Sequence, residues 1–176
     1  MTRACTMILL AAMFSFARAA AQDRSAGAGF AWNEFTASFQ IRVNDDGFLR
    51  TSLNLDMTDV ISGKSLYPGF SADAAYLFEF AEKRFRNGEY FTFFAGPGIC
   101  AGYVRNVSGD FGIMGALSGC IGFDYVFNVP FSLGLTLEPA IGVHLRRTAF
   151  GLTKMDFYKT GLISSLMPHL FIKYRF

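Results

Sequence analysis

Between Phe131 and Arg146 the sequence alternates without a break between two kinds of residue. The odd positions are all apolar: Phe131, Leu133, Leu135, Leu137, Pro139, Ile141, Val143 and Leu145. The even positions are small, polar or charged: Ser132, Gly134, Thr136, Glu138, Ala140, Gly142, His144 and Arg146. A period of two places consecutive side chains on opposite faces of a β-strand. The stretch therefore predicts a strand whose two faces meet different surroundings.

The same alternation recurs along most of the chain. It predicts seven strands, over residues 30–43, 48–59, 68–80, 89–104, 110–127, 131–146 and 162–176. Pro97, Pro139 and Pro168 cannot donate to a hydrogen-bond ladder, so we expect bulges or bends at these positions.

The second face of these strands is mostly Gly, Ala, Ser and Thr, which is too small and too weakly charged for a water-exposed surface. Charged residues are 17% of the chain, against about 25% in an average soluble domain. Small residues suit the narrow lumen of a barrel whose apolar face contacts lipid, and closure satisfies the backbone. The sequence therefore predicts an all-β fold, an antiparallel up-and-down transmembrane β-barrel. The alternative is a lipocalin-like soluble barrel, in which the apolar face would line the interior and the second face would meet water.

Bacterial single-chain barrels have an even number of strands with both termini in the periplasm, so seven strands are one too few. Three explanations remain open: residues 22–34 supply a short strand, the 147–161 loop hides one, or the true start codon lies upstream. We expect eight strands. The turns at 44–47, 82–88 and 128–130 are short and polar, as periplasmic turns are, whereas 60–67, 105–110 and 147–161 are expected outside.

The first 21 residues have the three parts of a secretory signal peptide: a basic start with Arg3, an apolar run from Ala4 to Ala17, and small residues ending at Ala21. The apolar run is too short to span a bilayer as a helix. We expect residues 1–21 to be a signal peptide and residues 22–176 to form one barrel domain. This predicts Sec-type export to the outer membrane of a diderm bacterium.

The export prediction leaves Cys100 and Cys120 in a compartment that permits disulfides. They are expected to point into the same lumen from neighbouring strands. A hairpin centre near Val107 would place Cys100 opposite Met114, about 20 Å from Cys120 along the strand. The sequence therefore predicts two free thiols.

The C-terminal residues continue the alternation to the last position. Leu170, Ile172, Tyr174 and Phe176 lie on the apolar face, and His169, Lys173 and Arg175 lie on the other. The ending resembles the C-terminal strand through which bacterial outer-membrane proteins engage the barrel assembly machinery. With Phe94-Ala95-Gly96-Pro97-Gly98-Ile99 and Ile121-Gly122-Phe123-Asp124-Tyr125, the chain resembles small eight-stranded barrels of the outer-membrane protein W and opacity-protein-like groups. This resemblance implies passage of small apolar solutes for the first group and adhesion for the second.

Charged residues on the lumen face gather near the periplasmic turns. The candidates for lumen ion pairs are Arg42, Glu79, Asp124, Glu138, His144, Lys173 and Arg175. Charges in a poorly solvated lumen must pair, so we expect a rigidifying network more than a proton or ion relay. Glu138 is expected near mid-depth, with a hydrogen bond to His144 or to a neighbouring strand.

The sequence contains no recognisable catalytic or metal-binding motif. Neither histidine neighbours a serine in a known pattern, and Gly-x-Ser-x-Gly, His-Glu-x-x-His and phosphate-loop motifs are absent. We expect no enzyme activity, no cofactor and no metal. Two of the 16 Lys and Arg residues lie in the predicted leader, so the remainder equals the 14 acidic residues. A nucleic-acid partner is therefore not predicted.

Two functions remain. The lumen glycines Gly96, Gly98, Gly102, Gly112, Gly122, Gly134 and Gly142 favour a narrow passive channel for small, apolar solutes. The 147–161 loop favours the alternative, a surface-exposed adhesion or structural barrel. Besides Arg146, its candidate contact residues for a surface ligand are Arg147, Phe150, Lys154, Phe157, Tyr158 and Lys159.

Overall fold

The computed structural model describes residues 24–63, 66–106, 110–147, 152–164 and 167–176. The predicted signal peptide (1–21) and Phe150 lie outside these ranges. None of the helices in the described residues is long and apolar enough to cross a membrane.

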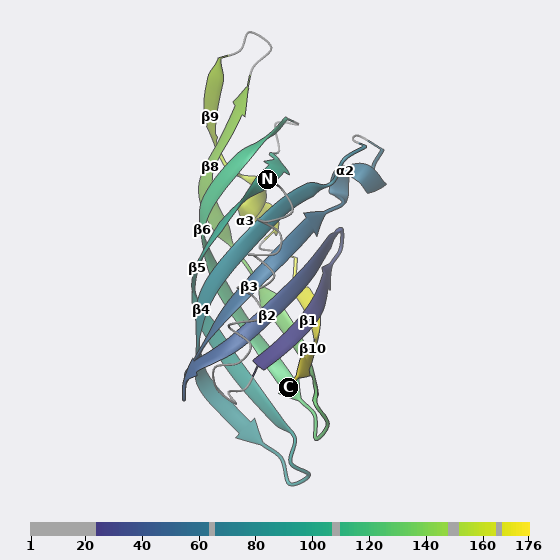
Figure 1. The fold of residues 1–176 in the computed structure, drawn as a ribbon, viewed down its shortest axis with the longest axis vertical. Coiled ribbons are helices and arrows are strands. Elements are labelled where there is room, and N and C mark those ends of the chain that lie inside the picture. The colour runs from purple at the N-terminus through teal and green to yellow at the C-terminus, as the bar shows by residue number, and fades with distance from the viewer. Residues whose placement is uncertain (1–23, 64–65, 107–109, 148–151, 165–166) are drawn as a thin grey trace, which may run out of the picture.

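The described strands form a closed antiparallel barrel (Figure 1). They are β1 (Arg24–Ala31), β2 (Glu34–Asn44), β3 (Gly47–Asp56), β4 (Gly69–Arg84), β5 (Tyr90–Arg105), β6 (Phe111–Val126), β7 (Phe131–Leu137), β8 (Ala140–Arg147), β9 (Thr153–Phe157) and β10 (His169–Arg175). The ring runs from β1 through β7 in sequence order, then to β10, which pairs with both β7 and β1. The predicted all-β fold with eight strands in the barrel is confirmed.

The eighth strand comes from the first of the three explanations. β1 pairs with β2 through a two-residue turn at Trp32 and Asn33. The predicted strand 30–43 is therefore wrong at its start, because it runs through this turn. The alternation in β1 is weak because most of its residues are alanine and glycine. The Phe171 ring lies only 2.5 Å from where a Cβ on Gly29 would stand, so this position has no room for a larger side chain.

The upper half of the barrel is completed by β8 and β9. β7 and β8 both pair with β6, β7 along its second half and β8 along its first half. Glu138 and Pro139 interrupt the chain between them. β9 pairs with β8, so the predicted 147–161 loop contains a hairpin strand. The short helix α3 (Thr160–Ser164) then leads to β10, and the predicted strand 162–176 is wrong over its first part. Helix α2 (Thr58–Ile61) ends the predicted strand 48–59 at Asp56.

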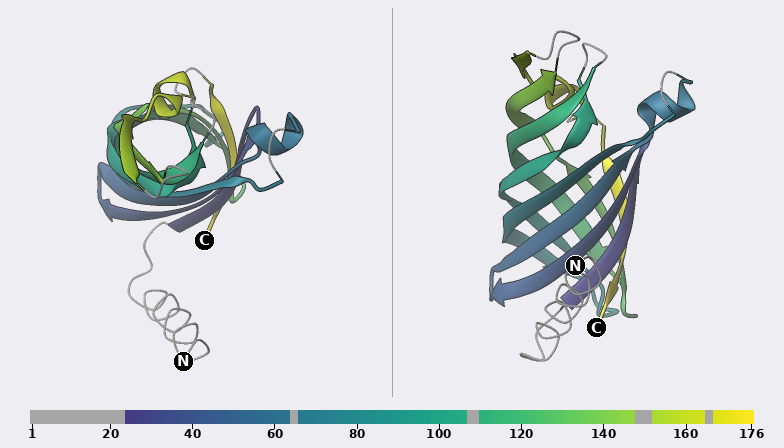
Figure 2. Two further views of the ribbon diagram at one scale, coloured as in Figure 1. Left: turned by 90° about the horizontal axis from the view of Figure 1, so that it is seen from above. Right: turned by 45° about the horizontal axis from the view of Figure 1, so that its top comes forward.

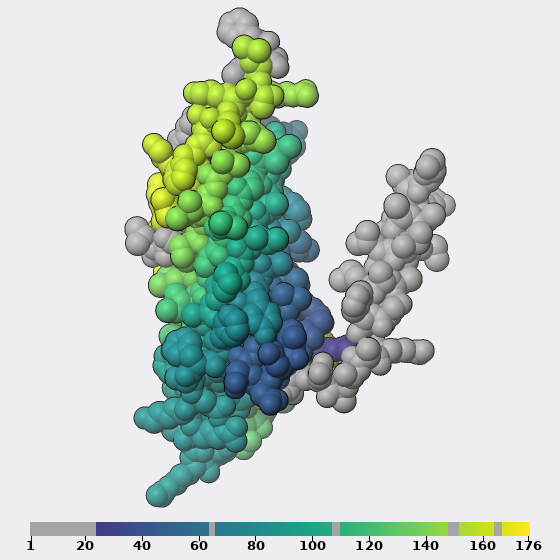
Figure 3. All heavy atoms as spheres, turned by 90° about the vertical axis from the view of Figure 1, so that its left-hand side faces the viewer, coloured from purple at the N-terminus to yellow at the C-terminus, as the bar shows by residue number. Residues whose placement is uncertain are grey.

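The turns divide between two ends of the barrel (Figure 2). The β2–β3, β4–β5 and β6–β7 turns lie at the end that also holds β1's first residue and the C-terminus, here called the lower end. Helices α2 and α3 and the β8–β9 hairpin lie at the upper end. The β4–β5 hairpin projects below the rest of the wall (Figure 3). This division matches the predicted alternation of short and long turns.

The two faces of the wall have the compositions that the alternation predicts. The outward face carries exposed apolar side chains, among them Leu53, Ile99, Leu117, Ile141 and Ile172. Inward positions of the same strands, such as Ser52, Thr136 and Lys173, are buried. The protein is thus apolar outside and polar inside, the reverse of a soluble barrel.

Candidate functional site: the barrel lumen

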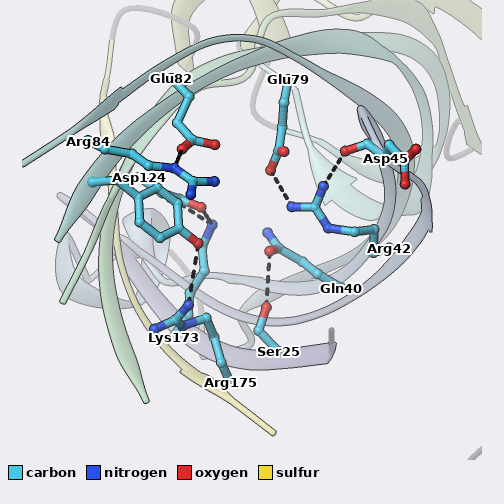
Figure 4. A network of polar contacts seen from close by, with 11 residues as sticks. Ser25, Gln40, Arg42, Asp45, Glu79, Glu82, Arg84, Asp124, Lys173 and Arg175 are labelled. Carbon is cyan, nitrogen blue, oxygen red and sulfur yellow. Dashed lines mark hydrogen bonds and ion pairs between the residues drawn. The ribbon is translucent and has the colours of Figure 1, made fainter. Parts of the chain in front are cut away.

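The lower lumen is filled by a network of polar contacts (Figure 4). Arg42 Nη2 lies 2.9 Å from Glu79 Oε1, and Arg42 Nη1 donates to the Asp45 carbonyl at 2.6 Å. Lys173 Nζ donates to both oxygens of Asp124 at 2.9 and 2.7 Å. These two pairs join four of the residues proposed from the sequence.

Arg175, the fifth proposed residue at this end, does not pair with a carboxylate in any contact that the structure gives it. Its guanidinium donates to the carbonyls of Phe127 and Val129 at 3.2 and 3.1 Å, and to the Tyr90 hydroxyl at 3.4 Å. It therefore ties the β6–β7 turn to the last strand. A cavity of about 70 Å³ remains between these side chains.

Above this network a layer of fully buried side chains fills the lumen. Arg50, Lys173, Phe94, Phe171 and Leu77 are each at most 1% exposed. The Lys173 ammonium lies 5.3 Å from the centre of the Phe94 ring, and the Arg50 guanidinium lies 5.7 Å from that of Phe171. Cation–π contacts and dispersion hold such a layer together. We call these five residues the lumen plug.

Arg50 is the functional residue that the sequence reasoning missed. The alternation is weaker in its strand, which was predicted over residues 48–59, than between Phe131 and Arg146. Position 50 belongs to the same inward series as Ser52, so extending the phase by one step would have placed it in the lumen.

Glu138 is the partner of Arg50. Its Oε1 lies 2.8 Å from Arg50 Nη2 and also accepts from the Thr136 hydroxyl at 2.8 Å. Glu138 lies between β7 and β8 and keeps the inward orientation of the even positions, as the alternation predicts. The expected bond to His144 is wrong, because the His144 Nε2 contacts the Val104 carbonyl at 3.0 Å.

The lumen glycines do not leave the open space that the channel prediction assumed. A Cβ added to Gly96 would stand 1.9 Å from the Tyr76 carbonyl oxygen, and one on Gly142 would stand 2.2 Å from that of Gly115. At Gly134 the nearest atom would be Asp124 Oδ1, at 2.2 Å. Backbones and neighbouring side chains already fill these positions. The glycines permit close packing of the wall, as glycine in a curved sheet often does.

Part of the segment predicted to be an outer loop packs into the upper lumen. Tyr158 is buried, stacks on His144 and packs with Val104 and Met114. Its proposed role as a surface contact is therefore wrong. Lys154 and Phe157 lie in β9 with exposed side chains, Arg147 ends β8, and Lys159 precedes α3.

The positive charge at this end is partly neutralised by acidic neighbours. Arg146 contacts Asp110 and lies 3.1 Å from Asp156, and Lys154 lies 3.4 Å from the same carboxylate. The expected basic surface is therefore reduced to Arg147 and Lys159 among the described residues of the segment.

Cys100 and Cys120 are free thiols. The prediction of their separation used a register that is off by two residues, since Cys100 faces Ala116 and Cys120 faces Gly96. The Cys100 side chain is still close to that of Met114, with 3.7 Å between Sγ and Sδ. Within the described ranges, no group of three His, Cys, Asp or Glu side chains could hold a metal ion.

Comparisons with known proteins were made against family models, curated proteins and solved structures. No family model and no curated protein matches the chain. Among solved structures, the N-terminal β-barrel domain of Pseudomonas aeruginosa OprF matches 88% of this chain and 96% of its own, at 16% identity and a TM-score of 0.48. A similarity this low carries no argument about this chain, whose fold rests on its own structure. The resemblance to the outer-membrane protein W and opacity groups is not confirmed.

Proposed function

We propose that the protein is an integral barrel of a bacterial outer membrane, with its lower end in the periplasm. The outward face supports this, because a continuous apolar wall requires lipid around it. Aromatic rings gather at the lower rim, where Phe91 and Tyr125 lie 4.8 Å apart between ring centres, and Phe131 and Tyr174 lie 5.3 Å apart. Such rings favour the membrane–water interface.

We infer that the barrel is sealed and acts through its upper end, as a surface-exposed adhesion or structural barrel. The lumen plug is the observation that carries this inference. Arg50 and Lys173 each require a carboxylate partner in the lumen, and both have one. Opening a path would expose or separate these pairs, at a cost of several kcal/mol.

Passage of small apolar solutes is the second candidate function. The observation that favours it is a cavity at the upper end, whose rim includes the exposed side chains of Trp32, Ile163 and Met167. An apolar molecule could enter there, but it would meet the lumen plug below. Transit would then require the plug to move.

The proposed partners follow from the surfaces. Outer-membrane lipid covers the wall, and the barrel assembly machinery would engage the last strand through Leu170, Ile172, Tyr174 and Phe176. Each of these four side chains is exposed on the outward face. No enzyme activity and no nucleic-acid partner is proposed.

Two experiments test the proposal. A closed barrel resists detergent until boiled, so unboiled and boiled samples should migrate differently on a gel. Proteoliposomes in an isotonic sugar solution should swell no faster than protein-free liposomes. Identical migration together with solubility in aqueous buffer would refute the membrane barrel, and rapid swelling would refute the sealed lumen.

A further inference from the structure

The upper end of the barrel contains a cavity of about 230 Å³. It lies between the β1–β2 turn, with Trp32 and Glu34, and the segment of α3, with Ile163. Asp56 at the end of β3 and His169 at the start of β10 complete its polar wall. None of the five residues of the lumen plug lines this cavity, whereas Tyr158 and Val104 of the upper cluster do.

Two carboxylates face each other at one side of the cavity. Glu34 and Asp56 are direct partners in the β2–β3 register, on the inward series of both strands. Like charges in this position repel. Asp56 accepts a hydrogen bond from the Thr58 backbone N–H at 2.9 Å.

The basic side chains near this end are committed elsewhere. Arg105 lies 3.0 Å from Asp59, and Arg50 pairs with Glu138. In the described part of the chain, neither Glu34 nor Asp56 forms an ion pair with a lysine or arginine. The carboxyl groups of Glu34 and Asp56 therefore have no basic partner in the described part of the protein.

A second, independent feature is the ring of His169. The residue is 5% exposed, lines the cavity, and its Nδ1 has no hydrogen-bond partner. A buried polar atom without a partner destabilises the folded state, and a bound polar group or a water molecule is the usual remedy.

The rim of the cavity is apolar and open. Trp32 is 75% exposed, Ile163 is 55% exposed and Met167 is 44% exposed. An indole ring attracts organic cations through its face as well as apolar groups. The cavity thus combines an interior lined by two carboxyl groups with an aromatic and aliphatic rim.

We propose that this cavity binds a primary amine that carries a small apolar group. The ammonium lies between Glu34 and Asp56, and the apolar group packs against Trp32, Ile163 and Met167. The absence of a three-ligand metal cluster in the described residues favours an organic cation over a metal ion. The proposal rests on the proposed function in one respect, because this end must face the outside for the ligand to arrive from there.

Trp32 provides the measurement, because it is the single tryptophan of the chain. The barrel, purified and folded in detergent micelles, is titrated with 2-phenylethylamine at pH 7 while tryptophan emission is followed. We expect a saturable change in emission. The neutral analogue 2-phenylethanol and the anionic analogue 3-phenylpropionate, which enter micelles as well, should give changes that are weaker by about tenfold or more.

The double substitution Glu34→Gln and Asp56→Asn is the decisive variant. It replaces two carboxyl groups that have no basic partner with amides of the same shape, so we expect it to fold as well as the parent while its affinity for the amine falls by about tenfold or more. Glu82→Gln is the matched control, since it neutralises an exposed carboxylate at the lower end and should leave the titration unchanged.

Equal responses to the amine and its two analogues, or an unchanged affinity in the double variant, would overturn the proposal. The measurement needs neither a membrane nor an orientation. If the barrel binds the amine but lets liposomes swell, the sealed lumen is refuted and the amine site stands. If the barrel is sealed but does not bind the amine, the amine site is refuted and the sealed lumen stands.

Discussion

Arg50 Nη2 lies 2.8 Å from Glu138 Oε1 inside the barrel, and only 1% of the Arg50 side chain is exposed. The two residues come from β3 and from the interruption between β7 and β8, so the contact crosses the lumen. Two further nitrogens of Arg50, Nε and Nη1, have no hydrogen-bond partner. The guanidinium therefore depends on Glu138 for its balancing charge.

We predict that Glu138→Ala destabilises the folded barrel by about 3–5 kcal/mol, because it leaves a buried arginine without its partner. Urea unfolding of the barrel in lipid vesicles, followed by tryptophan emission, measures the change. Glu82→Ala removes the partner of the exposed Arg84 and should cost at most about 1 kcal/mol. Similar losses of unfolding free energy in both variants would show that the buried Arg50–Glu138 pair stabilises the barrel no more than the exposed Arg84–Glu82 pair.

We predict that Gly96→Ala prevents normal closure of the barrel. Its Cβ would stand 1.9 Å from the Tyr76 carbonyl oxygen, so the β4 or β5 backbone would have to move. Gly115→Ala is the matched control, because no atom lies within 4 Å of its added Cβ. The heat-dependent gel shift should be lost or reduced in the first variant and kept in the second. A normal shift in Gly96→Ala would mean that this position has the free space that an open lumen requires.

We predict that deleting Phe176 impairs assembly in cells more than it impairs the stability of the refolded barrel. The Phe176 N–H donates to the Arg24 carbonyl at 2.9 Å, but its ring is exposed on the outward face. Its loss removes little packing while altering the end that resembles an assembly signal. Outer-membrane levels and urea midpoints of the two forms provide the comparison. Normal levels of the truncated protein in the outer membrane would contradict this prediction.

We predict that Tyr158→Ala loosens the upper end without opening the barrel. The change removes a buried ring that packs with Val104, Met114 and His144, and comparable losses of large side chains cost about 3–5 kcal/mol. Cys100 packs against the same cluster. Its reaction with a small maleimide should therefore accelerate, whereas Cys120, in the lower cluster with Leu77 and Phe94, should react at the parent rate. Unchanged reactivity of Cys100 would place Tyr158 outside the lumen.

The period of two predicts the wall of the barrel well because lipid and lumen impose opposite demands on alternate residues. It fails where the alternation is carried by small side chains, as in β1, whose Gly27 and Gly29 make room for Lys173 and Phe171. The period also places a residue on a face without giving its depth.

The candidate site was predictable only in part for the same reason. Arg42, Glu79, Asp124 and Lys173 could be predicted to lie together, because each is close to a turn or to the C-terminus at the same end of the barrel. The contact between Arg50 and Glu138 depends on how strands far apart in the ring are staggered, which one sequence does not reveal. Tyr158 lay in a segment without alternation, so its burial depended on the packing of the β8–β9 hairpin.

The sealed lumen is the central claim, and planar-bilayer recording of the refolded wild-type barrel tests it most directly. Inserted protein should give no discrete conductance steps above the bare bilayer, because Arg50, Lys173, Phe94, Phe171 and Leu77 fill the lumen at mid-depth. Insertion is verified in the same samples by the heat-dependent gel shift. Stable unitary steps from verified wild-type barrels would contradict the account and restore the channel.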